Sequence, residues 1–158
     1  FIFLLMNLMG LLLCQEMPMR LSMRKTDLAY TAGIIDGEGC IGIYKHPSQS
    51  SKDKIRYTLT ITVAMTNEWT IQWLRFAYGG SVKSQQRPLR KRVWIWTVEA
   101  QQALVFLKLI SPYLHLKHPQ AELAIKFQEN KKRQPGSNHL LEEAQSIIMK
   151  GMKHNAII

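Results

Sequence analysis

The stretch that decides the fold runs Tyr30-Thr31-Ala32-Gly33-Ile34-Ile35-Asp36-Gly37-Glu38-Gly39-Cys40-Ile41. Small residues come first, then two isoleucines, and then two acids that alternate with glycines. Thr26 and Asp27 are residue types that cap helices, and residues 28–36 carry apolar side chains at helical spacing. The pattern predicts a helix that starts at these caps and ends at the glycines of residues 37–39, where the chain turns.

Two strands follow on the carboxyl side of this stretch. Residues 40–46 have the composition of a strand, and residues 47–54 form a polar loop. Residues 55–66 alternate clearly, with apolar side chains on one face and polar ones on the other. The apolar set is Leu59, Ile61, Val63 and Met65, and the polar set is Arg56, Thr58, Thr60 and Thr62.

The remaining chain repeats this order of elements and then becomes helical. We predict a helix over residues 69–77, strands over 81–86 and 93–98, and a basic segment, residues 87–92, between these strands. Helices are predicted over 99–110, 119–130 and 139–152, with a linker over 131–138. The order αββαββα predicts a mixed α/β (α+β) domain with a four-stranded antiparallel sheet and helices on one face.

The face of the sheet without helices is expected to be polar. Such a twisted ribbon can enter the DNA major groove, whereas a solvated face is the simpler alternative. Basic loops at both hairpin tips, around Lys52 and Lys54 and over residues 87–92, favour DNA and would contact phosphates. The expected DNA-binding residues are Tyr44, His46, Arg56, Thr58, Thr60, Thr62, Lys83, Gln85, Arg87, Arg90 and Arg92.

The composition agrees with a nucleic-acid partner. The chain has 158 residues, a formal net charge of +10 and a pI near 9.8. Such an excess of positive charge favours nucleic acid first and an anionic membrane surface second, with a merely soluble basic protein as the alternative. The two cysteines, Cys14 and Cys40, lack the C-x-x-C spacing of zinc sites and indicate a reducing compartment.

Residues 1–23 begin with an apolar run that is short for a membrane-spanning helix and lacks the charged start of a secretory signal. We interpret residues 1–23 as an appendage outside the fold, or alternatively as an extra packed helix, and residues 24–158 as the domain. No membrane partner is expected.

Residues 30–41 resemble the signature of the LAGLIDADG homing endonucleases, which are metal-dependent DNA-cutting enzymes. A second segment, residues 111–121, resembles the Pro-Tyr-Leu…Lys…Gln-Ala turn of this family. The resemblance covers about residues 26–130. It implies a site-specific double-stranded DNA endonuclease, a phosphodiester hydrolase encoded in an intron.

The first helix carries small residues that predict a self-association face. Gly33 and Gly37 are four residues apart, and with Ala32 nearby they would let another backbone approach closely. A chain with one such helix has no internal partner for it, so a homodimer is predicted, with a glycine-weakened helix on its own sheet as the alternative. We expect Asp36 to lie in this interface and to cap the facing helix of the second copy.

The resemblance also implies the catalytic groups. It makes Glu38 a metal ligand, assisted by the backbone carbonyl of Gly37, with Mg²⁺ as cofactor and Mn²⁺ as a substitute. Lys117 would support the water network or the transition state, although without the motif it would be an ordinary surface lysine. Asn67 is the candidate for a residue near the attacking water. Ile71 departs from the family, which often has a basic residue there, and this departure puts full activity in doubt.

Two other functions stay open: an RNA-binding maturase of the same fold that binds its own intron, and a DNA-binding protein that does not cut. The family's usual occurrence in organellar introns implies a chloroplast or mitochondrial location.

Overall fold

The computed structural model describes residues 23–49, 55–133 and 139–154. Most of the predicted appendage, all but Met23, therefore lies outside the described residues, as do Lys52 and Lys54 at the tip of the first hairpin. No helix in the described part of the chain is long and apolar enough to cross a membrane.

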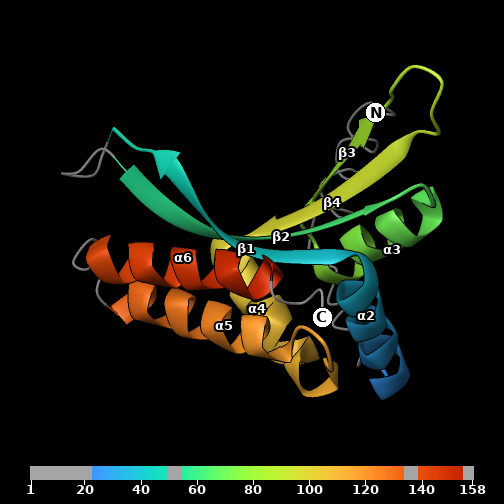
Figure 1. Ribbon diagram of the computed structural model, residues 1–158. Helices are drawn as coiled ribbons and strands as arrows, with labels where there is room; N and C mark the ends of the chain where they lie inside the picture. The colour runs from blue at the N-terminus through green and yellow to red at the C-terminus, as the bar shows by residue number, and fades with distance from the viewer. Residues whose placement is uncertain (1–22, 50–54, 134–138, 155–158) are drawn as a thin grey trace, which may run out of the picture.

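The centre of the fold is a four-stranded antiparallel sheet with the order β1-β2-β4-β3 (Figure 1). One row of the register runs from Gly39 through Val63 and Trp96 to Val82, and joins all four strands. The predicted mixed α/β fold with such a sheet is confirmed. The strands are β1 (Gly39–Pro47), β2 (Ile55–Met65), β3 (Ser81–Gln85) and β4 (Val93–Glu99).

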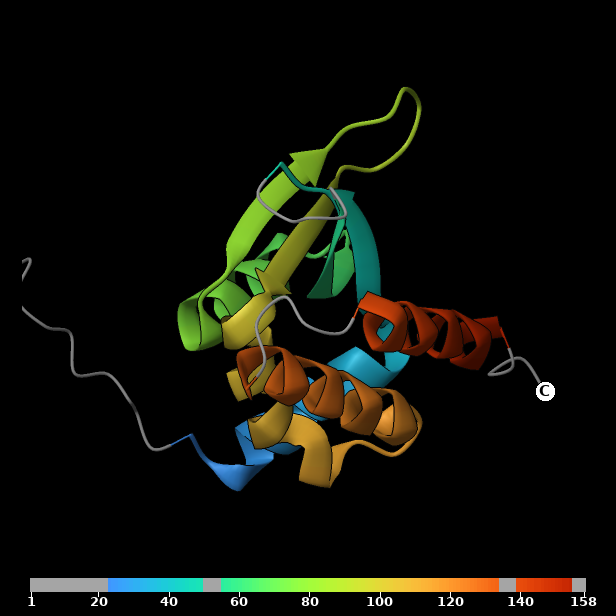
Figure 2. The same ribbon diagram turned by 90° about the vertical axis from the view of Figure 1, so that its left-hand side faces the viewer.

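The helices lie mainly on one side of this sheet, as Figure 2 shows from the side. Their order along the chain agrees with the prediction, with ends shifted by a few residues. They are α2 (Lys25–Glu38), α3 (Glu68–Tyr78), α4 (Ala100–Ile110), the 3-10 helix η1 (Ser111–Tyr113), α5 (His118–Arg133) and α6 (His139–His154). Helix α5 thus extends into the stretch that we predicted to be a linker, as far as Arg133.

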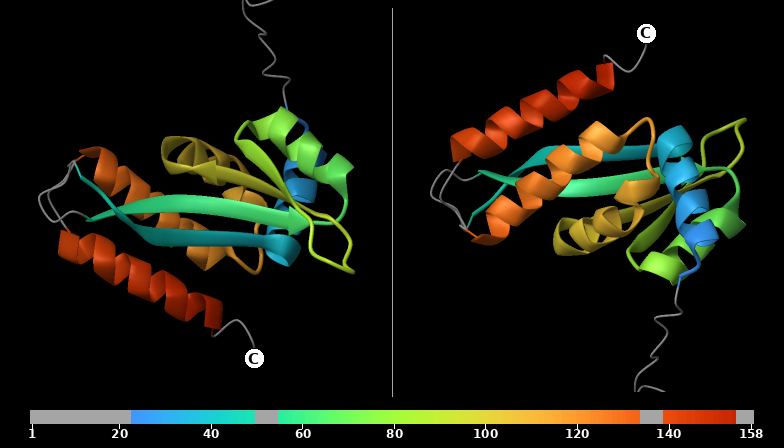
Figure 3. Two further views of the ribbon diagram at one scale, coloured as in Figure 1. Left: turned by 90° about the horizontal axis from the view of Figure 1, so that it is seen from above. Right: turned by 90° about the horizontal axis from the view of Figure 1, so that it is seen from below.

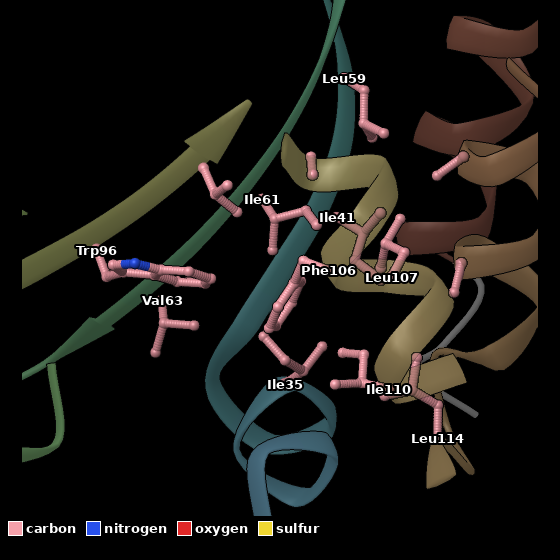
Figure 4. Packing of buried hydrophobic residues seen from close by; sticks show 14 of the residues in the cluster. Ile35, Ile41, Leu59, Ile61, Val63, Trp96, Phe106, Leu107, Ile110 and Leu114 are labelled. Carbon is pink, nitrogen blue, oxygen red and sulfur yellow. The ribbon is translucent and has the colours of Figure 1, made fainter. Parts of the chain in front are cut away.

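The hydrophobic core fills the space between the sheet and these helices. Figure 4 shows Phe106 of α4 among apolar side chains of α2, β1 and β2. The Phe106 ring meets the Trp96 ring edge to face at 5.2 Å, and the Trp96 indole N–H donates to the Gly79 carbonyl at 2.7 Å. The indole thereby buries its ring without losing a hydrogen bond. Leu59, Ile61 and Val63 are also fully buried, which confirms the predicted core face of β2.

Helix α2 starts and ends differently from the prediction. Its N-cap is Arg24, without a side-chain hydrogen bond, so Thr26 and Asp27 lie inside the first turn rather than capping it. Its last residue is Glu38, and Gly37 is helical. Gly39 allows the exit into β1, because a Cβ atom there would lie 2.7 Å from the Ile35 carbonyl oxygen.

Helix α6 lies along the outer edge of β1, so the helices are not all on one face (Figure 3). The Ser146 hydroxyl donates to the Ile43 carbonyl oxygen at 2.9 Å, and Lys45 pairs with Glu143. In the same region the Lys131 ammonium of α5 donates to the Tyr57 carbonyl. The bonds from Ser146 and Lys131 satisfy the carbonyl groups of two strand residues, which periodicity alone did not predict.

Candidate functional site

The candidate site lies where α2 ends and the sheet begins. Glu38 is the last residue of α2. The next residue, Gly39, belongs to the register row that crosses all four strands. Its side chain is exposed, and among the described residues it has no hydrogen-bond or ion-pair partner. Gly37 beside it is exposed as well. The predicted metal-binding pair is therefore open to a ligand.

Asp36 has a role different from the predicted one. We expected its carboxylate to cap a helix of a second copy, but it accepts the backbone N–H groups of residues that precede α5 in its own chain. One oxygen accepts from His115 at 2.9 Å and Leu116 at 3.3 Å, and the other accepts from Lys117 at 2.9 Å. Burial raises the pKa of Asp36, but these donors and the Lys117 charge outweigh it and hold the pKa below 3.8.

The Lys117 side chain in turn donates hydrogen bonds to the end of α2. Its ammonium donates to the carbonyl oxygens of Ile35 at 2.8 Å and Asp36 at 2.7 Å in the last turn of the helix, and the Ile35 oxygen also accepts the Gly39 N–H. Burial lowers the pKa of Lys117, although the nearby Asp36, Cys40 and Glu38 act in the other direction. Lys117 is thus a half-buried cation beside Glu38, and it is not an ordinary surface lysine.

Asn67 lies at the start of α3, and Ile71 lies inside this helix. Asn67 is the N-cap, and its side-chain oxygen accepts from the Thr70 N–H at 2.9 Å and the Thr70 hydroxyl at 3.1 Å. Only its amide NH₂ group remains for the predicted contact with water. Ile71 is fully buried in the core. The isoleucine is explained by packing, and a basic side chain would not be accommodated at this position.

The described residues contain no group of three or more His, Cys, Asp or Glu side chains that could hold a metal ion. One copy of the chain offers the Glu38 carboxylate and the carbonyls at the negative end of the α2 dipole. These are hard oxygen donors of the type that Mg²⁺ and Ca²⁺ prefer. The donor set fits such an ion in kind.

The exposed face of α2 contains Gly33 and Gly37, and a Cβ atom built on either glycine meets nothing within 4 Å. Ala32, which we predicted to lie in the interface, is not on this exposed face, because it is fully buried in the core of its own chain. Aromatic side chains of α2 and α3 continue this face: Tyr30 packs on Trp73 at 5.6 Å between ring centroids. Trp69 and Phe76 are mainly exposed.

The register places every predicted DNA-binding residue of the strands on one face of the sheet, which we call the open face. His46, Thr58 and Thr62 are partly exposed, and Arg56, Lys83 and Gln85 are exposed. Thr60 differs, because it is only 7% exposed and its hydroxyl donates to Glu99 at 3.4 Å. The bend of β3 and β4 away from the helices leaves this face uncovered over much of the sheet (Figure 1).

A cluster of Cys40, Tyr44 and Lys153 lies on the open face, and the sequence did not predict the position of Lys153 in it. The Lys153 ammonium of α6 lies 3.2 Å from the Cys40 sulfur and 3.3 Å from the Tyr44 hydroxyl, with Cys40 and Tyr44 3.4 Å apart. The ammonium also lies 5.0 Å from the centroid of the Tyr44 ring. Burial raises the pKa of Cys40, but the bonds from Tyr44 and Lys153 lower it below 9.0. No periodicity in the sequence places the end of α6 beside β1.

The basic segment 87–92 joins β3 to β4 and is exposed throughout. Since β3 and β4 meet at Gln85 and Val93, this loop leaves the sheet beyond the row of Gly39 and Val63, at the end where Glu38 lies. The Arg92 guanidinium lies 5.9 Å from the Trp94 ring centroid. The predicted residues Arg87, Arg90 and Arg92 therefore lie at the same end of the sheet as Glu38.

Comparisons with known proteins agree on the architecture. No protein-family model matches the chain, and no curated protein matches its sequence. Among solved structures, homing endonuclease I-CvuI in complex with the I-CreI target matches with a TM-score of 0.68 and 20% identity, over 81% of this chain and 82% of that chain. That complex was solved with magnesium, and its DNA is not cleaved.

Two further structures extend this likeness. The archaeal intron-encoded homing endonuclease I-Vdi141I, complexed with DNA, has a TM-score of 0.63 and 12% identity, over 84% of this chain and 85% of that chain. The LAGLIDADG homing endonuclease I-SmaMI, bound to cleaved DNA, has a TM-score of 0.60 and 14% identity, over 84% of this chain but 45% of that chain. The chain therefore has the fold of the LAGLIDADG homing endonucleases.

Proposed function

We propose that this protein is a site-specific double-stranded DNA endonuclease that works as a homodimer with Mg²⁺. The observation that carries the proposal is the exposed, unpaired Glu38 carboxylate beside the half-buried Lys117 ammonium, at the edge of the open face. The Glu38 carboxylate is free to bind a metal ion, and hydrogen bonds hold the Lys117 ammonium beside it. This arrangement is suited to metal-assisted hydrolysis of a phosphodiester.

A dimer would complete the metal site. Each copy contributes one exposed carboxylate, and two copies of Glu38 close together would need cations to balance their charge. The open glycine face of α2, flanked by exposed Trp69 and Phe76, is a surface that a second copy would cover. The match to about half of I-SmaMI supports the same arrangement, because that longer chain has room for two such units.

The residues of each copy would act as follows. Glu38 and the Gly37 carbonyl would hold Mg²⁺, which when bound activates water and stabilises charge on the phosphate. Lys117 has three N–H donors and uses two on α2, so the third is available to a phosphate oxygen or an ordered water. Asp36 holds the Lys117 backbone in place and thereby positions this donor.

The open face would bind DNA. Thr58, Thr62, His46 and Gln85 can donate and accept hydrogen bonds with base edges. The arginines of residues 87–92 can bind phosphates. The DNA complexes of I-CvuI and I-Vdi141I, which share this fold, support DNA binding by this chain.

The test is a cleavage assay with Mg²⁺ on duplexes that the wild-type protein selects from a randomised pool. We expect the wild type to cut, and Glu38→Gln to bind DNA but not cut. Glu122→Gln is the matched control, since this glutamate is exposed on α5 and makes only a surface contact with His118. Its cleavage should equal that of the wild type.

The same preparation distinguishes the other two functions. A wild-type protein that binds intron RNA tightly but cuts no duplex would support the maturase and overturn our proposal. Binding of a specific duplex without cutting at any divalent-metal concentration would indicate a DNA-binding regulator.

A further inference from the structure

The loop between β3 and β4 is a compact turn, held by its own hydrogen bonds. The Arg90 N–H donates to the Arg87 carbonyl at 3.2 Å, which closes a four-residue turn with Pro88 and Leu89 at its centre. The Gln86 side chain donates to the carbonyls of Arg87 at 3.1 Å and Arg90 at 2.7 Å. The loop therefore presents its tip in a defined orientation, ahead of any partner.

The residue at the tip is unusual for this turn. Leu89 has a φ of 60°, at the third position of a turn with proline second, where glycine or asparagine is favoured. A leucine in this left-handed conformation is strained. Turn geometry alone would favour another residue here.

Packing does not explain Leu89 either. Its relative exposure is 106%, above the 81% of Leu140 and the highest among the large apolar residues that the structure describes. Four cations surround it in the sequence: Arg87, Arg90, Lys91 and Arg92. A fully solvated leucine among positive charges stabilises nothing in the isolated chain.

The surroundings of Leu89 indicate which partner would cover it. A second copy would bring the same cations, and its loop would be repelled. Double-stranded DNA offers phosphates to the arginines and, between them, apolar surface: thymine methyl groups and the faces of bases at a flexible step. Lys83 and Gln85 lead along the open face of β3 to this loop, so DNA on that face would reach the tip.

We propose that Leu89 is an apolar DNA-contacting residue that meets bases, while the arginines on either side bind phosphates. The inference rests on the proposed DNA-binding function and adds a specificity-determining residue to it. Burial of a leucine side chain against bases would strengthen binding about tenfold to a hundredfold.

Two substitutions separate apolar contact from loop geometry. Leu89→Asn keeps a residue that tolerates the positive φ but removes the apolar side chain. We expect its melting temperature to stay equal or rise, and its affinity for the selected duplex to fall at least tenfold. Leu89→Met keeps the apolar character, and we expect affinity within about threefold of the wild type. Leu140→Ala, at an exposed leucine of α6, is the control and should bind normally.

The salt dependence of binding gives an independent readout. Arg90→Ala should reduce the slope of log affinity against log salt by about one, because a phosphate contact is lost. Leu89→Asn should weaken binding at every salt concentration and leave the slope unchanged. A merely structural role of Leu89 would not produce this difference.

The outcomes are distinct. If the wild type selects no duplex, the proposed function fails, and this inference fails with it. If the wild type binds and Leu89→Asn binds equally well, or if Leu89→Met loses as much affinity as Leu89→Asn, the role of Leu89 is overturned while the proposed function stands.

Discussion

Asp36 and Lys117 bind each other's main chain. The Asp36 carboxylate accepts the Lys117 backbone N–H at 2.9 Å, and the Lys117 ammonium donates to the Asp36 carbonyl oxygen at 2.7 Å. The pair joins the end of α2 to the segment before α5, which is 81 residues further along the chain. Glu38 lies two residues after Asp36 in the chain. We therefore expect its position to depend on both Asp36 and Lys117.

Replacing Asp36 with Asn should destabilise the protein in a pH-dependent manner. The amide cannot accept all three backbone donors, so we expect the free energy of unfolding to fall by about 1–3 kcal/mol at neutral pH. The folded-state pKa of Asp36 lies below its usual 3.8, so its contribution is present above that pH and is lost as the pH falls through the folded pKa. Urea unfolding from neutral to acid pH measures this. A difference between variant and wild type that stays constant below about pH 3 would contradict the assignment.

Lys117→Met should lose both stability and cleavage. Two carbonyl groups at the end of α2 would lose their charged donor, and we expect a loss of about 2 kcal/mol in unfolding free energy and about a hundredfold in cleavage rate. Glu38→Gln is the matched comparison, because Glu38 is exposed and its loss should reduce cleavage without reducing stability. Denaturation and single-turnover cleavage, measured on the same samples, separate the two effects. Full cleavage by Lys117→Met would refute a role for this lysine in the reaction.

Gly33→Leu should prevent dimerisation without preventing folding. A side chain there meets nothing within one copy, and leucine forms helices more readily than glycine by up to about 1 kcal/mol. We expect a folded monomer in analytical ultracentrifugation, with the circular dichroism of the wild type. Gly39→Ala is the contrasting variant, since its Cβ would collide with the Ile35 carbonyl and unsettle the fold itself. A Gly33→Leu protein that remains dimeric would place the interface elsewhere.

Lys153→Met should make the Cys40 thiol less reactive. The bond and the charge from Lys153 help to hold the Cys40 pKa below 9.0, so their loss should raise that pKa and reduce the thiolate fraction at neutral pH. Each pKa unit corresponds to about a tenfold slower alkylation by iodoacetamide. The measurement uses a Cys14→Ser background, with Lys150→Met, an exposed α6 lysine, as control. Equal rates in the two variants would show that Lys153 does not act on the thiol.

The sequence predicted the features that follow from local periodicity. The alternation of β2 placed Leu59 and Ile61 in the core and Thr58 and Thr62 on the open face, because side chains of a strand point to opposite sides in turn. The assignment of Glu38 to the site had a different origin, because it came from the resemblance of residues 30–41 to the LAGLIDADG signature and not from periodicity.

What the sequence did not predict depends on contacts between distant segments. The Asp36 carboxylate accepts hydrogen bonds from backbone groups 79 to 81 residues away, and no local sequence pattern predicts such bonds. Ala32 was placed on the exposed face because it adjoins Gly33, although the helical rotation of one residue turns it into the core. Lys153 lies at the open face because α6 packs beside β1, a contact between segments that are distant in the sequence.

The position of α6 has a consequence for how copies of the chain can meet. Because Ser146 takes up the Ile43 carbonyl, β1 offers no unbroken row of free backbone groups to which another molecule could add a strand. Continuous ribbons of molecules joined along this border are disfavoured, which leaves the glycine face of α2 for the proposed dimer. For the proposed endonuclease, a closed border would keep the molecules dispersed during the search for a rare sequence in DNA.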